Sequence, residues 1–175
     1  HADRKSGSVY FSNEFKTGGI IKSDKTKFRG NSIKTKDGDI LNIGKIEVKV
    51  MHTPGHTYDH NCYLIKDKLL SGDCLFIGDV GRIDLGGDAR KKAKLLYESL
   101  RKLEKLSPDT RVYPNHVGAA HAINSEDSFS TISNEMKNNE AFQIKNIDDF
   151  YEYMTEGWPP KPDNWEKIIE DNLNG

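Results

Sequence analysis

The 175-residue sequence predicts a single domain of the α+β class, from its length and from two kinds of hydrophobic pattern. A chain of this length buries roughly 70% of its unfolded surface around one core. Residues 33–50 alternate apolar and polar side chains, as half-buried strands do. Residues 89–109 instead repeat apolar side chains at helical spacing, opposite a face of Lys, Arg and Glu. Strands and helices therefore both contribute to the predicted fold.

The strands are predicted in a few short stretches separated by turn signals. Within residues 33–50, Asp37-Gly38 and Ile43-Gly44 interrupt the apolar runs, so we expect antiparallel neighbours there. The polar turn at residues 66–68 lies between two short apolar runs, which is the pattern of a hairpin. The further strands are expected at residues 62–65, 69–70 and 110–114.

The longest predicted helix lies in residues 89–106, and Pro108 is expected to end it. Its basic face is typical of the solvated side of an amphipathic helix rather than of a nucleic-acid-binding surface. A capped, polar helix is predicted in residues 125–142, and a turn followed by a short C-terminal helix in residues 159–175. The apolar residues of the first helix are Ala93, Leu96, Leu100, Leu103 and Leu106.

The amino-acid composition argues against several kinds of partner and site. The 26 basic and 27 acidic residues leave a net charge of -1, which gives no reason to expect a nucleic-acid or anionic-membrane partner. No apolar run reaches membrane-spanning length, and the first residues do not resemble a signal peptide. Cys62 and Cys74 are far apart in sequence, which disfavours a disulfide scaffold or a thiolate zinc site. We therefore expect a soluble, cytoplasmic protein.

Three predicted strands run directly into loops that carry metal-ligand side chains. The loops MHTPGH, SGD and PNH bring His56, Asp73 and His116 to strand ends, from which they can point at a common site. Gly55 and Gly72 precede the first two, as expected where the backbone bends sharply. Imidazole and carboxylate together suit zinc, iron or manganese. The alternative is that Pro-Gly and Gly-Asp are ordinary turn dipeptides.

The order HTPGHT, SGDCLF, VYPNH resembles the metallo-β-lactamase superfamily, which implies an αββα sandwich over residues 1–175. The opening HADR resembles the end of that superfamily's His-x-His-x-Asp-His motif, so His1 and Asp3 would be its second histidine and its aspartate. Arg4 stands where the last histidine belongs. By this resemblance the chain is the C-terminal portion of the fold, and the N-terminal strands and the first histidine would lie upstream.

Residues 72–106 and 112–142 resemble the iron-dependent persulfide dioxygenases, including bacterial forms fused to rhodanese domains. The resemblance implies one Fe(II) per chain, with zinc as a possible substitute, held by the catalytic residues His56 and Asp73 and by the upstream histidine. The implied reaction oxidises glutathione persulfide, or another low-molecular-weight persulfide, with O2 to sulfite and the thiol.

Two alternatives stay open. One is a thiolester hydrolase of the related glyoxalase II type, which uses two metals and a full second ligand set. Asp3, His116 and His1 are the candidates for additional ligands, but the guanidinium of Arg4 has no lone pair for a metal. The other is a truncated, inactive domain. An unpaired sheet edge in a truncated fold would favour a homo-oligomer.

Two further residues are candidates for substrate binding. Arg82 is expected to clamp a carboxylate of glutathione through its guanidinium fork, or else to pair at the surface with Asp84 or a loop carbonyl. Tyr113 could line the substrate pocket, or lie half in the core. The remaining histidines match no ligand position and are interpreted as loop or supporting residues: His52, His60 and His121.

Overall fold

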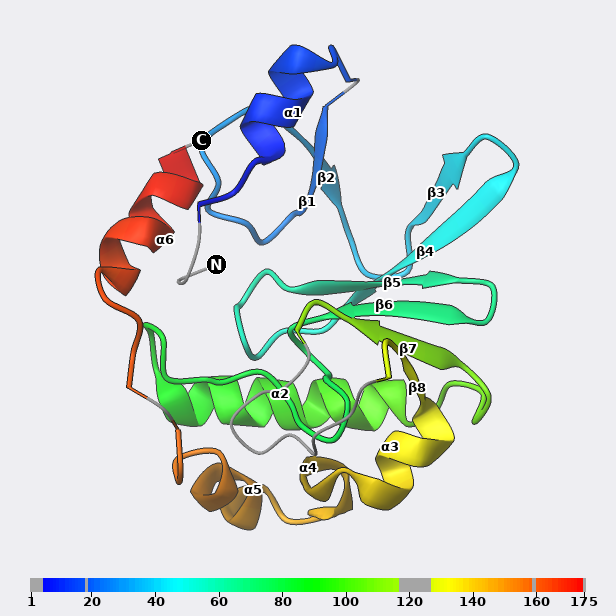
Figure 1. Cartoon of the computed structure of the whole chain (residues 1–175), viewed down its shortest axis with the longest axis vertical. Coiled ribbons are helices and arrows are strands. Elements are labelled where there is room, and N and C mark those ends of the chain that lie inside the picture. Colours follow the sequence, from blue (N-terminus) through cyan, green and yellow to red (C-terminus); the bar gives the residue numbers. More distant parts are fainter. Residues whose placement is uncertain (1–4, 18, 117–126, 159, 175) are drawn as a thin grey trace.

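The computed structural model describes residues 5–17, 19–116, 127–158 and 160–174. Its strands form a two-stranded sheet and a six-stranded sheet (Figure 1). The small sheet pairs β1 (Ile20–Ser23) with β2 (Ser32–Thr35) in parallel. The large sheet has its strands in sequence order: β3 (Ile40–Ile43), β4 (Ile46–His52), β5 (Asn61–Ile65), β6 (Lys68–Gly72), β7 (Arg111–Pro114) and β8 (Ser130–Thr131).

The directions of the large-sheet strands decide where their loops emerge. Both β4 and β6 run antiparallel to β5, so they point the same way. The connection from β6 to β7 passes through a helix, and β7 lies parallel to β6. The C-terminal ends of β4, β6 and β7 therefore meet at one edge of the sheet.

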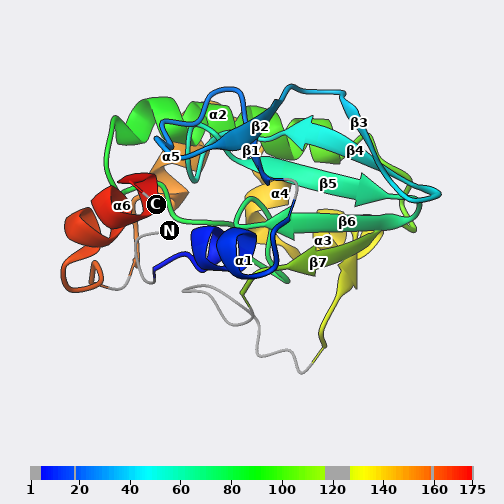
Figure 2. The same cartoon turned by 90° about the horizontal axis from the view of Figure 1, so that it is seen from above.

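One long helix covers one face of the large sheet. This is α2 (Ala89–Leu103), and the helices between residues 132 and 153 lie on its far side (Figures 1 and 2). The side chain of Asp88 accepts a hydrogen bond from the backbone N–H of Lys91 and so caps the helix. The other helices are α1 (Ser8–Glu14), α3 (Ile132–Asn138), α4 (Glu140–Gln143), α5 (Ile147–Tyr153) and α6 (Trp165–Asn174).

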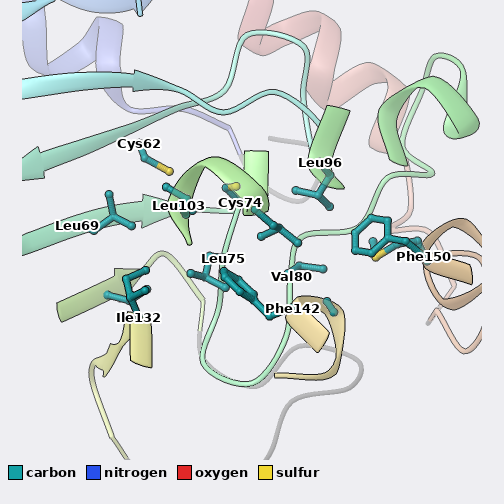
Figure 3. Packing of buried hydrophobic residues seen from close by; sticks show 14 of the residues in the cluster. Cys62, Leu69, Cys74, Leu75, Val80, Leu96, Leu103, Ile132, Phe142 and Phe150 are labelled. Atoms are coloured by element: carbon teal, nitrogen blue, oxygen red, sulfur yellow. The ribbon is translucent and has the colours of Figure 1, made fainter. Parts of the chain in front are cut away.

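The main core lies between α2, the sheet and the C-terminal helices. Apolar side chains of all three layers gather there, including Leu69 of β6, Leu96 of α2 and Phe142 and Phe150 of the C-terminal helices (Figure 3). Both cysteines are buried in this core as free thiols. The fully buried apolar residues of α2 are Ala93, Leu96, Leu100 and Leu103, which are four of the five predicted apolar positions.

The predicted elements are mostly confirmed, with corrections at their boundaries. The hairpin of β5 and β6, the strand β7 and the C-terminal helix lie where expected. The long helix ends at Leu103, with Glu104 as C-cap, so Pro108 is not its stop. The predicted polar helix is divided into α3 and α4, because Asn139 leaves the helical conformation and caps α4.

The pairing of β2 differs from the prediction. Residues 33–50 do contain strands and the turn at Gly44, and β3 pairs antiparallel with β4. However, β2 lies in the other sheet, beside β1, because period-two alternation fixes the faces of a strand but not its partner. The helices α1 and α5 and the strands β1 and β8 were not predicted from the sequence.

Several large apolar side chains of the β3–β4 hairpin are exposed, and Ile43 is the most exposed of them at 61%. Among the described residues, no helix is both long and apolar enough to cross a membrane.

Candidate metal centre

His56 is placed by a tight loop that packs on α2. Gly55 has φ 148°, and a Cβ added there would lie 2.4 Å from the Cβ of Leu96. Only glycine fits both the backbone conformation and this approach. The predicted need for glycine before His56 is therefore confirmed.

Asp73 follows β6 through Gly72, which has φ 56°. The backbone N–H of Cys74 donates to the carbonyl of Ser71, closing a turn that directs Asp73 inward. Asp73 is 2% exposed. Because the backbone N–H of Asn115 donates to the carbonyl of Gly72, the loop after β7 lies directly beside this turn.

The three predicted ligand residues lie together. Nε2 of His56 is 3.5 Å from Oδ2 of Asp73, and Nδ1 of His116 is 2.9 Å from Oδ1 of the same carboxylate. The side chain of His116 is 33% exposed, whereas that of His56 is 13% exposed. The site thus has a buried side at His56 and an open side at His116.

The imidazole of His56 is held in one tautomer. Its Nδ1 donates to the carbonyl of Arg82 at 2.8 Å, because a carbonyl oxygen can only accept. The lone pair of the neutral ring is then on Nε2, which faces Asp73. Burial lowers the pKa of His56 to about 4, although the charge of Asp73 acts in the opposite direction. A neutral imidazole oriented by a backbone carbonyl is the usual arrangement of a metal-ligating histidine.

The chemistry of this donor set fits a divalent transition metal. Two imidazoles and a carboxylate suit zinc, iron or manganese. Within the part of the chain that is described, no three His, Cys, Asp or Glu side chains have the geometry of a closed metal site. His116 and Asp73 hydrogen-bond to each other instead. His1 and Asp3, as well as Arg4, lie outside the described residues.

Arg82 makes a bidentate contact with a carboxylate of its own chain. Its Nε and Nη2 donate to the two carboxylate oxygens of Asp84 at 2.7 and 2.8 Å, and its guanidinium lies over the ring of Trp158. This is the pairing that the alternative interpretation of Arg82 predicted. Burial opposes ionisation of Asp84, but the bonds from Arg82 leave its pKa below the ordinary value. The clamp on a substrate carboxylate stays a prediction.

Tyr113 lies in β7 and stacks on Phe129, with ring centroids 5.5 Å apart. A cavity of about 550 Å³ lies against Phe129, Ile77 and Asn134, and Tyr113 is not among its lining residues. Its predicted contact with substrate remains untested.

Two groups support the ligands, and only the second was among the supporting histidines interpreted from the sequence. One is the carbonyl of Arg82, which leaves no side-chain signal. The other is His60, whose Nε2 accepts the backbone N–H of Asp73 at 3.1 Å. His52 contacts Asn61 at the end of the β4–β5 ladder. His121 lies outside the described residues.

Comparison with protein families matches residues 4–116 to the metallo-β-lactamase superfamily. A hydroxyacylglutathione hydrolase of Francisella tularensis subsp. novicida is 40% identical over 87 residues, which are 48% of this chain and 33% of that protein.

Two solved structures extend the likeness to the whole chain. A metallo-β-lactamase of Staphylococcus aureus aligns with 100% of this chain and 55% of its own, with TM-score 0.89 and 27% identity. ETHE1 from Myxococcus xanthus aligns with 99% of this chain and 72% of its own, with TM-score 0.85 and 25% identity. These likenesses confirm the fold that the motifs predict, and this chain spans about a third to three quarters of the proteins it matches.

Proposed function

The chain belongs to the metallo-β-lactamase superfamily, and on this premise we propose that it carries the iron site of a persulfide dioxygenase. The reaction consumes glutathione persulfide, O2 and water and yields glutathione and sulfite. The outer sulfur is oxidised by four electrons, which reduce the two oxygen atoms of O2, and water supplies the third oxygen of sulfite.

The observation that carries this proposal is the pairing of a buried, neutral His56 with Asp73 at the sheet edge. Members of the superfamily bind metal ions. His56 Nε2 and one Asp73 oxygen would hold the metal. When bound, iron would supply a redox-active Lewis acid for a persulfide sulfur and O2.

The side chains of this chain would bind and orient the substrate. The fork of Arg82 already holds a carboxylate, that of Asp84, in the bidentate geometry that a glutathione carboxylate would need. The carbonyl of the same residue orients His56. Arg82 would therefore link the position of the substrate to the orientation of the metal ligand His56.

Two likenesses support the dioxygenase class. The residues after Asp73 resemble persulfide dioxygenases, and the likeness to ETHE1 agrees with that resemblance. Arg4 also stands in the second metal position of the motif, which a one-metal enzyme does not need.

A second candidate is a thiolester hydrolase of the glyoxalase II type. The observation in its favour is that the Asp73 carboxylate contacts His56 through one oxygen and His116 through the other. A carboxylate so placed could bridge two metals. The identity to the hydroxyacylglutathione hydrolase supports the same reading.

Metal analysis combined with two assays separates the candidates. Protein purified without added metal is analysed for iron and zinc, then assayed for O2 consumption with glutathione persulfide and for thiolester hydrolysis. One iron per chain with O2 consumption is the expected result. Two zinc ions with thiolester hydrolysis would support the second candidate, and protein that retains no metal and has neither activity would refute both.

Matched histidine variants provide the control. His56→Gln should abolish metal binding and activity, because the amide cannot replace a buried imidazole ligand. His52→Gln changes a neighbouring histidine that contacts Asn61, and it should retain both. Equal losses in the two variants would indicate general damage to the fold.

A further inference from the structure

His60 directly precedes β5, and one side of its ring faces the backbone of Asp73. The N–H of Asp73 donates to Nε2 of His60 at 3.1 Å. A backbone N–H can only donate, so Nε2 must present its lone pair. The ring proton of the neutral imidazole is therefore on Nδ1.

The contacts on the other side of the ring fit this tautomer. Nδ1 lies 2.9 Å from Oγ1 of Thr53, and this hydroxyl is 3.2 Å from Sγ of Cys62. With Nδ1–H donating to the hydroxyl, the hydroxyl proton is available to the sulfur. The thiol of Cys62 then donates to the carbonyl of Ser71 at 3.3 Å. Each group in this series therefore donates its proton to the next group, and the series ends at the carbonyl of Ser71.

The surroundings hold His60 in this position. Thr53, Cys62 and Ser71 are fully buried, and the backbone N–H of Thr53 donates to the carbonyl of His60. A Cβ at residue 72 would lie 2.6 Å from Nε2 of His60. The glycine before Asp73 therefore leaves room for this ring as well as permitting the turn.

We propose that His60 is a positioning residue for the candidate metal centre, acting as the acceptor that fixes the backbone of Asp73. Its Nε2 holds the N–H of Asp73, and the Thr53–Cys62–Ser71 chain fixes the tautomer that makes this possible. His56 and His60 thus share one tautomer but differ in role: His56 points its lone pair at the metal position, and His60 points its own at the backbone of the other ligand. The inference rests on the proposed metal site.

Two amide variants separate this role from simple packing. In His60→Gln the amide oxygen can reach the position of Nε2 and accept from Asp73. In His60→Asn the shorter amide reaches only the position of Nδ1, near Thr53. The affinity for Zn²⁺ alone, measured by chelator competition, should fall about 10- to 100-fold in His60→Asn and much less in His60→Gln. Equal affinities of the two variants would overturn the inference.

A measurement on metal-free protein makes the result independent of the enzyme activity. Nitrogen chemical shifts should show His60 protonated at Nδ1. Exchange of the Asp73 amide proton should be about tenfold faster in His60→Asn than in wild type, and close to wild type in His60→Gln. An Nε2–H tautomer, or an unchanged exchange rate in His60→Asn, would refute the positioning role. If instead these results appear as expected but wild type consumes no O2 with glutathione persulfide, the proposed function fails and the role of His60 stands.

Discussion

The substitution Gly81→Ala should disable the candidate site without unfolding the domain. A Cβ at residue 81 would lie 1.9 Å from the carbonyl oxygen of Asp73 and 3.1 Å from Nδ1 of His56. Contacts between carbon and oxygen become tolerable only above about 3 Å, so the two segments must separate by about 1 Å. A displacement of about 1 Å at a catalytic group costs on the order of 100-fold in rate. Both proposed ligands would be affected at once.

The assay compares Gly81→Ala with Gly7→Ala. Residue 7 is a suitable control because a Cβ there meets only the Phe11 ring, at an ordinary distance of 3.6 Å. We expect Gly81→Ala to lose most of its bound metal and about 99% of kcat/KM, while Gly7→Ala retains both. Urea unfolding of each variant checks that the fold persists. A folded Gly81→Ala protein with the metal content and kcat/KM of wild type would refute the reasoning that this contact sets the site.

Three other predictions follow from single side chains. Arg82→Lys keeps the charge but loses the bidentate fork, so it should raise KM for glutathione persulfide more than it lowers kcat. Unchanged kinetics would mean that Arg82 only pairs with Asp84 and does not bind the substrate. Burial lowers the pKa of Lys92 from 10.5 to about 8, so at high pH the folded chain releases this proton before the unfolded chain does. The free energy of unfolding of wild type should therefore rise by about 3 kcal/mol relative to that of Lys92→Met as the pH increases from below 8 to 10.5. Urea unfolding that shows a constant difference between the two proteins across this range would contradict it. Leu100→Ala should lower the free energy of unfolding by about 3 kcal/mol, because Leu100 is fully buried. Leu70 is 43% exposed, so Leu70→Ala should lower it by less than about 1 kcal/mol in the same assay.

The convergence of His56, Asp73 and His116 could be predicted because each follows a strand, and strand direction is encoded locally. The polar turn at residues 66–68 makes β5 and β6 antiparallel, and a helix between β6 and β7 is long enough to return the chain in parallel. Strand ends that share an edge bring their loops together. The meeting of these loops therefore does not depend on side-chain packing.

The parts that sequence reasoning missed depend on information that residue patterns do not carry. The parallel pairing of β1 with β2 is a choice of partner, which alternation of apolar residues does not specify. The roles of the Arg82 carbonyl and of His60 depend on backbone atoms, which are the same in every residue. The sequence also does not decide between the two predicted partners of Arg82, because a charged side chain near a site can form its hydrogen bonds within its own chain, as Arg82 does with Asp84.

The helical connection between β6 and β7 also bears on the order of events during folding. Strands β3 to β6 are joined by short loops and can pair early, as successive hairpins. Asp73 and His116 come together only after α2 has packed on the sheet and β7 has paired with β6. A metal that bound both side chains, as the second candidate function requires, would therefore be bound late in folding. Added metal should slow the unfolding rate and leave the folding rate almost unchanged.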